Sequence, residues 1–195
     1  MTSLPTEAVE RFEDGMQLAS EAGEIEPTAM SLATVNLEGG ASVRTVLIKS
    51  FDAQGFVFYT NTLSRKGRQL ANHPSAALSV FWKSIAQQVL AEGSVEPVTE
   101  AEADAYFASR PRGSQIGAWA SIQSEVLDSR ETLEQRVADF ENEFAGKQVS
   151  RPSHWSGYKL IPSQIEFWYG EESRLHNRFR FTLVGGDWRR ERLYP

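Results

Sequence analysis

The chain has 195 residues, of which 41% are hydrophobic and 24% charged, and these fractions are typical of one folded domain that buries its own core. A net charge of −6 argues against a protein that binds nucleic acid through a broad basic face. Cysteine is absent, which excludes disulfides, thiolate nucleophiles and cysteine-bound metal centres.

The first 25 residues predict an amphipathic helix with a loose leader. Val9, Phe12 and Met16 recur near the helical period, and Gly23 ends the pattern. The N-terminus lacks the basic segment and apolar core of a signal peptide, and no later apolar run approaches the ~18 residues that a membrane span needs. We therefore expect a cytoplasmic protein with no membrane partner.

Three short strands follow, at residues 28–37, 42–51 and 56–60. Residues 38–40 and 52–55 contain the glycines typical of tight turns between strands. Consecutive strands joined in this way predict a meander that begins a sandwich or barrel.

The rest of the chain mixes helices and strands. We expect, in order, a helix at 64–72 stopped by Pro74, strands at 76–82 and 88–95, a helix at 99–109 with a capping box, a helix at 128–144 capped by Asp128, strands at 158–161 and 164–169, and a hairpin at 178–184 and 188–193. No element is predicted for residues 110–125. The fold class is mainly β with flanking helices (α+β), and residues 26–195 are expected to form a single domain behind the segment 1–25.

Two groups of cations suggest a phosphate ligand. Arg65 and Lys66 open the helix at 64–72, where free backbone N–H groups and the helix dipole already favour an anion. Arg44 and Lys49 lie in a strand with the apolar residues Val43, Val46, Leu47 and Ile48, so each needs an anionic partner. A regular strand would point these two side chains to opposite faces, so one site can use both only through a bulge or the strand edge. The alternative is a solvated basic helix end beside two edge-strand charges.

The segment R-L-H-N-R carries a second candidate site. Arg174, His176 and Arg178 alternate along what reads as an extended chain, and three such groups on one face would repel one another without an anionic or electron-rich ligand. Trp168 ends the preceding I-E-F-W and is expected to contact the ligand, whereas the other tryptophans are expected in the core or an interface.

Several common chemistries have no support in the sequence. G-x-G-x-x-G, G-x-x-x-x-G-K-[ST] and G-x-S-x-G are all absent, which argues against a nicotinamide dehydrogenase, a P-loop NTPase and an α/β-hydrolase. His73 and His154 are expected to be structural, and no metal site is predicted.

Six motifs in fixed order carry a family resemblance: R-T-V-L-I-K, F-Y-T-N-x-x-S-R-K, Q-V-L-A-E-G, Y-F-x-S-R-P-R-x-S-Q-I-G-A-W-A-S-x-Q-S, I-E-F-W-x-G and R-L-H-x-R, with R-L-x-P at the end. Over residues 28–195 the chain resembles the pyridoxine/pyridoxamine 5'-phosphate oxidases. The resemblance implies an FMN-binding split β-barrel that works as a homodimer with two sites at the subunit interface. It also implies oxidation of pyridoxine 5'-phosphate or pyridoxamine 5'-phosphate to pyridoxal 5'-phosphate, with O2 reduced to H2O2.

The same resemblance implies the roles of individual residues. The cofactor-binding residues would be Arg44, Thr45, Val46, Leu47, Ile48, Lys49, Tyr59, Thr60, Arg65, Lys66, Gln88, Gln123, Ser124, Trp168 and Arg178. The substrate-binding residues would be Lys49, Tyr106, Arg110 and Ser114 around the phosphate, with Arg174, Leu175 and His176 over the ring. Arg174 and His176 would be the catalytic pair.

Three positions depart from the usual pattern: Gln87 replaces a common Arg, Tyr169 a common Gln, and Asn177 a common Asp. Their effects are open, as are the preferred vitamer and the presence of a second, regulatory pyridoxal-phosphate site.

Three other interpretations compete with this one. A split-barrel flavin oxidase or reductase with another substrate would keep the FMN residues but lose Tyr106, Arg110, Arg174 and His176, all of which this chain has. A non-catalytic FMN or pyridoxal-phosphate carrier would not turn over with oxygen. A nucleic-acid module built on the basic start of the helix at 64–72 is the weakest.

Overall fold

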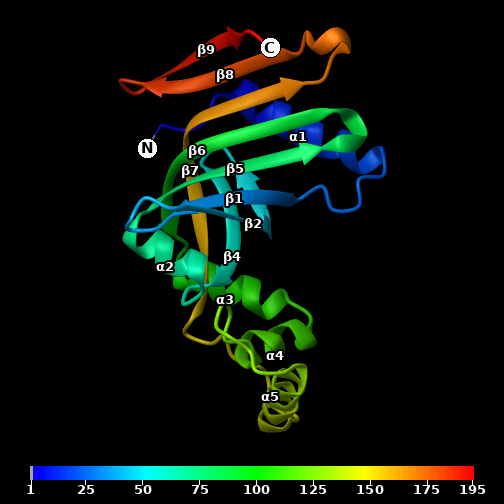
Figure 1. Ribbon diagram of the computed structural model, residues 1–195, viewed down its shortest axis with the longest axis vertical. Helices are drawn as coiled ribbons and strands as arrows, with labels where there is room; N and C mark the ends of the chain where they lie inside the picture. Colours follow the sequence, from blue (N-terminus) through cyan, green and yellow to red (C-terminus); the bar gives the residue numbers. More distant parts are fainter. Residues whose placement is uncertain (1) are drawn as a thin grey trace.

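The computed structural model describes residues 2–195, in which a nine-stranded antiparallel sheet is accompanied by five α-helices (Figure 1). The helices are α1 (Thr6–Glu21), α2 (Arg65–Asn72), α3 (Glu100–Ser109), α4 (Arg112–Ala120) and α5 (Arg130–Glu143), with 3₁₀ turns η1 (Lys83–Ile85) and η2 (Glu172–Arg174). The strands are β1 (Ala29–Val35), β2 (Ala41–Leu47), β3 (Ser50–Asp52), β4 (Gly55–Asn61), β5 (Ser75–Trp82), β6 (Gln87–Pro97), β7 (Trp155–Tyr169), β8 (Asn177–Val184) and β9 (Asp187–Leu193).

The strand order is β2-β1-β5-β6-β7-β4-β3, with β8 added to β7 and β9 to β8. Strands β2 and β4, separated in the chain only by the short strand β3, therefore stand near opposite ends of the path, and within residues 2–195 no ladder of hydrogen bonds joins them. The predicted meander is wrong at this point. The barrel is split between β2 and β4, so the expected fold class, a mainly β split barrel with flanking helices, is confirmed.

The split arises at residues 48 and 49, where the predicted strand 42–51 breaks in two. The Ile48 N–H donates to the carbonyl of Thr28 beside β1, whereas the Lys49 N–H donates to the carbonyl of Val57 in β4. The Ile48 side chain turns into the core, where it is 3% exposed. Because the chain bends here, Arg44 and Lys49 can face one cavity although an odd number of residues separates them.

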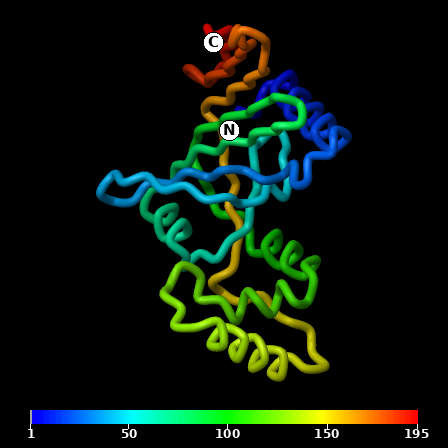
Figure 2. The backbone as a smooth tube through the Cα atoms, turned by 45° about the vertical axis from the view of Figure 1, so that its right-hand side comes forward, coloured from blue at the N-terminus to red at the C-terminus, as the bar shows by residue number. Residues whose placement is uncertain are grey.

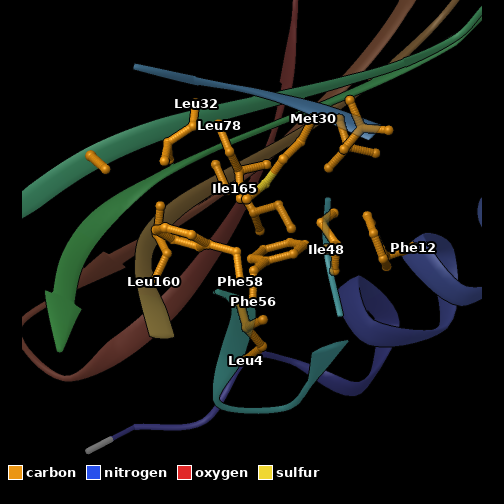
Figure 3. Packing of buried hydrophobic residues seen from close by; sticks show 14 of the residues in the cluster. Leu4, Phe12, Met30, Leu32, Ile48, Phe56, Phe58, Leu78, Leu160 and Ile165 are labelled. Atoms are coloured by element: carbon orange, nitrogen blue, oxygen red, sulfur yellow. The ribbon is translucent and has the colours of Figure 1, made fainter. Parts of the chain in front are cut away.

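The main core lies inside the barrel and extends beneath α1. Figure 3 shows Phe12 of α1 beside Ile48 and Met30, with Phe56, Phe58 and Leu160 from β4 and β7. The predicted helix in residues 1–25 is confirmed as α1, whose buried face carries Ala8, Phe12, Gly15 and Ala19. Gly15 permits the close approach, because an added Cβ would lie 2.5 Å from the Trp82 ring.

A second, smaller core joins α3, α4 and α5 to the start of β7. Its buried members are Phe107, Ile116, Phe144, Val149 and Trp155. Figures 1 and 2 both show these helices gathered at the end of the molecule opposite β8 and β9. The open side of the barrel thus faces a helical unit with its own packing.

Several predicted boundaries need correction. The strands at 158–161 and 164–169 are one strand, β7, which absorbs Pro162 through a shift of register opposite Glu92 and Gly93. Residues 110–125, for which no element was predicted, contain α4. The cap of α5 is Ser129, whose hydroxyl accepts from the Thr132 N–H, and not Asp128.

Candidate functional site

A cavity of about 1170 Å³ opens in the split between β2 and β4 and is closed by α2, α3, α4 and the segment after α4. Fourteen of the residues that the sequence singled out line it: Arg44, Thr45, Val46, Leu47, Lys49, Tyr59, Thr60, Arg65, Lys66, Tyr106, Arg110, Ser114, Gln123 and Ser124. Ile48 does not, because its side chain lies in the main core.

Arg44, Arg65 and Lys66 form a cationic end of this cavity. Lys66, 7% exposed, places Nζ 3.1 Å from both Thr60 Oγ1 and Gln123 Oε1, while Arg44 donates to neutral oxygens such as Thr34 Oγ1 (2.6 Å). In the described part of the chain none of the three cations forms an ion pair with a carboxylate. Unpaired cations in one cavity favour binding of an anion.

The pKa values of this cluster reflect the same excess of positive charge. Burial, together with the charge of Arg44, lowers the pKa of Lys66 to about 8. Burial and the charge of Arg65 also lower the pKa of Arg44. A bound phosphate would relieve this mutual repulsion.

The N-terminus of α2 adds backbone donors to the cationic end. Ser64 caps the helix, and the Arg65 N–H donates to Ser124 Oγ at 3.1 Å. An added Cβ on Gly67 would lie 2.2 Å from the carbonyl oxygen of Thr62, so glycine lets the first turn pack this tightly. Helix N-termini of this kind bind phosphates.

A second anion-binding group comes from α3, α4 and the residues between them. Tyr106, Arg110 and Ser114 line the cavity there, and Lys49 lines it from beyond the end of β2. Arg110 Nη1 is buried without a hydrogen-bond partner in the described chain, and burial lowers the pKa of its guanidinium. An unpaired buried guanidinium nitrogen that lines a cavity is suited to a second anion.

The sequence missed Trp155, which also lines this cavity at the start of β7. It was expected in the core or an interface, and it does belong to the second core. No local motif could have revealed its position, because it reaches the site only through the pairing of β7 with β4.

Six predicted site residues lie away from the cavity: Gln88, Trp168, Arg174, Leu175, His176 and Arg178. They gather where β6, β7 and β8 pair, with Trp168 opposite both Gln88 and Arg178. The centres of the Trp168 and His176 rings are 4.5 Å apart. Arg178 Nη2 forms an ion pair with Oε1 of buried Glu166 at 2.7 Å. This second group is at the β8 end of the molecule in Figure 1, far from α3 and α4.

The prediction that Arg174 and His176 share one face of an extended chain is wrong. Arg174 ends the turn η2, in which Ser173 and Arg174 have φ angles of 55° and 61°. Two consecutive left-handed residues other than glycine are unusual, and such strain gathers at functional sites. The turn is held by the Glu171 N–H, which donates to His176 Nδ1 at 3.1 Å.

Gln87, Tyr169 and Asn177, the three residues that depart from the usual family pattern, pair or form hydrogen bonds with other residues of this chain. Tyr169 pairs across the strands with Gln87, and its hydroxyl accepts from Arg11 Nη1 at 2.9 Å, which ties β7 to α1. Asn177 Nδ2 donates to Glu171 Oε1 at 2.9 Å. His154, expected to be structural, places Nε2 3.1 Å from the carbonyl oxygen of Ala118.

Metal ligands and membrane spans were also sought in residues 2–195. No group of three or more His, Asp or Glu side chains there could hold a metal ion. No helix in that range combines the length and apolarity needed to cross a bilayer.

The fold and the cavity define a split-barrel protein in which two cationic groups line one cavity. Residues 18–143 match the family described as pyridoxamine 5'-phosphate oxidase, and residues 155–195 match the pyridoxine 5'-phosphate oxidase C-terminal dimerisation region. The chain belongs to the pyridoxamine 5'-phosphate oxidase family.

Proteins of known sequence or structure are similar to this chain over nearly its whole length. The chain is 53% identical to the pyridoxine/pyridoxamine 5'-phosphate oxidase of Myxococcus xanthus, covering 98% of this chain and 93% of that protein. It is 50% identical to the enzyme of the same name from Xanthomonas campestris pv. campestris, with both chains covered completely. Among solved structures, PhzG from Burkholderia lata in complex with tetrahydrophenazine-1-carboxylic acid is 33% identical, with a TM-score of 0.92 over 98% of this chain and 94% of that one.

Proposed function

We propose that this chain is an FMN-dependent oxidase that converts pyridoxine 5'-phosphate or pyridoxamine 5'-phosphate to pyridoxal 5'-phosphate, with O2 reduced to H2O2. The observation that carries the proposal is the presence, in one cavity, of two cationic groups that form no ion pair with a carboxylate of residues 2–195. A phosphorylated cofactor and a phosphorylated substrate would use one group each. The names of relatives at 50–53% identity support this assignment.

The cationic end fits FMN. Arg44, Arg65 and Lys66 would hold its phosphate, with the N-terminus of α2 and Ser124 supplying neutral donors. Thr45, Val46, Leu47, Tyr59, Thr60 and Gln123 line the same cavity and complete the part of the cofactor site that one chain supplies. When bound, FMN supplies the two-electron acceptor that oxidation of an alcohol or amine carbon requires.

The other group fits the phosphate of the substrate. Lys49 and Arg110 would supply two positive charges, and Tyr106 and Ser114 two hydroxyl groups. Charge-assisted hydrogen bonds of this kind contribute about 1.5–3 kcal/mol each. The phosphate would therefore anchor the substrate and orient its ring in the cavity.

Gln88, Trp168, Arg174, Leu175, His176 and Arg178 would complete the site of a partner subunit. Segment 155–195 matches the dimerisation region of the family, and these residues lie in it or are paired with it. In this proposal the protein is a cytoplasmic homodimer with two shared sites, and residues 26–195 form its FMN-binding domain.

The chemistry assigned to Arg174 and His176 is orientation and hydrogen bonding. Because the Glu171 N–H points at His176 Nδ1, that nitrogen is unprotonated, and the proton of the neutral imidazole lies on Nε2. His176 would donate this proton in a hydrogen bond to a polar substituent of the substrate ring. Arg174, projected by the left-handed turn, would cover the ring and exclude water.

A second candidate substrate is an aromatic carboxylic acid. PhzG, 33% identical over nearly the whole chain, is known in complex with tetrahydrophenazine-1-carboxylic acid. A carboxylate could occupy the group around Arg110, although it offers one negative charge where a phosphate carries about two.

Turnover distinguishes these candidates. The purified protein is loaded with FMN and mixed with pyridoxine 5'-phosphate or pyridoxamine 5'-phosphate, and O2 uptake and pyridoxal 5'-phosphate are measured. We expect one O2 consumed and one H2O2 formed per aldehyde. Failure to oxidise either phosphate ester, with oxidation of reduced phenazine carboxylic acids, would favour the second candidate. FMN binding without any turnover would indicate a carrier.

A further inference from the structure

Trp155, Tyr59 and Tyr106 form an aromatic wall of the cavity, and Trp155 has no role in the proposed binding of FMN or substrate. It is 6% exposed and stacks on Tyr59 with ring centres 5.3 Å apart and planes at 8°. Tyr106 lies parallel to both rings, 4.1 Å from Tyr59 and 6.0 Å from Trp155. Three nearly parallel rings at these distances form a rigid unit, since each restricts the rotation of the others.

Arg110 lies on this wall. Its Cζ is 4.7 Å from the centre of the Trp155 ring and 5.6 Å from that of Phe107. No carboxylate within residues 2–195 forms an ion pair with it, and Nη1 is buried without a partner. The aromatic faces are therefore the contacts that fix the guanidinium, while its hydrogen-bonding edge is left free.

We propose that Trp155 is a positioning residue that holds the face of the Arg110 guanidinium, so that its unpaired N–H groups are aimed at the phosphate of the substrate. A guanidinium held by cation–π contact keeps its charge and its planar edge, and little rotational freedom is lost when an anion binds. Trp155 would thereby set the preference for phosphorylated over unphosphorylated substrates. The inference rests on the proposed function of the Arg110 group.

A purely structural Trp155 would behave differently. Loss of packing in the second core lowers stability and affects every substrate alike. Loss of positioning raises KM for the phosphate ester and leaves kcat and the unphosphorylated substrate nearly unchanged.

The test compares Trp155→Leu and Trp155→Phe with the control Trp119→Leu in the FMN-loaded protein. Trp119 packs on Phe140 and Phe144 around the second core but does not line the cavity. We expect Trp155→Leu to raise KM for pyridoxine 5'-phosphate by a factor of roughly 5 to 30, with kcat within about twofold and KM for pyridoxine unchanged. Trp155→Phe should recover most of the loss, and Trp119→Leu should lower Tm without changing the ratio of the two KM values.

Two further variants show whether Trp155 acts through Arg110. In an Arg110→Ala background, Trp155→Leu should change the KM ratio much less than it does in the wild-type protein, because the guanidinium is gone and Trp155 then acts only through Tyr106. Arg110→Lys keeps the charge but loses the flat edge, so it should raise KM for the phosphate ester even if Trp155→Leu fails to fold. Additive effects in the double variant, or wild-type KM in Arg110→Lys, would overturn the inference.

Isothermal titration calorimetry of the FMN-loaded protein with inorganic phosphate measures anion binding by the Arg110 group without any turnover. Weaker phosphate binding in Trp155→Leu than in Trp119→Leu supports the positioning role even if the wild-type protein oxidises neither vitamer. Equal phosphate binding in the two variants would contradict it, whatever the activity.

Discussion

The side-chain amide of Asn177 donates to the carboxylate of Glu171 at 2.9 Å and closes the turn that carries Arg174 and His176. The Glu171 N–H donates to His176 Nδ1 in the same turn, so Glu171, on the N-terminal side of the turn, contacts two consecutive residues on its C-terminal side. Asn177 stands where an aspartate is common in the family. In this chain Glu171 supplies a carboxylate instead, and the amide at 177 is the donor that it needs.

Exchange of these two functional groups tests the contact. Asn177→Asp would place two carboxylates within hydrogen-bonding distance and remove the donor, so we expect kcat/KM for pyridoxine 5'-phosphate to fall by about tenfold or more. The double variant Glu171→Gln/Asn177→Asp reverses the hydrogen bond without changing any side-chain length. It should recover most of the activity, and a double variant no better than Asn177→Asp would show that this bond does not shape the turn.

The low pKa of Lys66 predicts a pH dependence of FMN affinity. Free protein loses the Lys66 proton near pH 8, whereas a bound phosphate favours the cationic form, so binding above this pH must take up a proton. Affinity should therefore change little near pH 7, begin to fall as the pH approaches 8, and fall toward tenfold per pH unit well above the pKa. Quenching of flavin fluorescence at several pH values measures it.

Lys66→Arg is the matched control, because a guanidinium stays charged throughout this range. Its FMN affinity should vary little between pH 8 and 9.5. Lys66→Met should bind FMN weakly at every pH. A wild-type affinity that does not change up to pH 9.5 would mean that Lys66 does not contact the phosphate.

Much of the cavity could be predicted because short motifs there specify both structure and charge. Ser64 marks a helix start, and Arg65 and Lys66 directly after it mark an anion site, so local sequence was sufficient. The same was true of the capping box at Thr99 and Glu102. The hydrogen-bond partners of both caps lie within three residues along the chain, so local sequence is enough to identify them.

Features that depend on distant packing could not be predicted. The break after Leu47 follows from burial of Ile48, and an apolar residue at the end of an apolar strand gives no sign of a bend. Helix α4 contains Gly113 and Gly117 and lacks a side-chain cap, so propensity argued against it and packing of Ile116 decided it. The left-handed conformation of Arg174 could not be predicted from the sequence, because this conformation is normally expected only at glycine or asparagine.

Arg174 and His176 are expected to act in catalysis and not in folding. Arg174→Ala and His176→Ala should keep FMN bound and the fold intact, while kcat/KM for pyridoxine 5'-phosphate falls by a factor on the order of 10²–10⁴. Glu172→Gln is the control, since this exposed residue shares the turn and contributes its backbone carbonyl to the Leu175 N–H. Near-wild-type turnover in both alanine variants would mean that the ring of the substrate is covered by another segment.

The final prediction concerns the sharing of one site by two chains. Helices α3 and α4, whose residues line the cavity beside Arg110, lie at the end of the molecule opposite β8, which directly follows the His176 segment, so a complete site would take one group from each subunit (Figure 1). Arg110→Ala and His176→Ala homodimers should each be nearly inactive. In a mixed dimer, however, one of the two sites combines the intact cavity of one chain with the intact His176 segment of the other.

Random mixing of the two variants, by co-expression or by refolding together, makes half of the dimers mixed, each with one intact site. Total activity should then recover to about a quarter of the wild-type value. The control pair is Arg110→Ala with Lys66→Met, which both damage the same cavity. Every mixed dimer of this pair carries a defect in each site, so no recovery is expected. If neither pair recovers, or if both do, the site is not divided between the subunits in the way proposed.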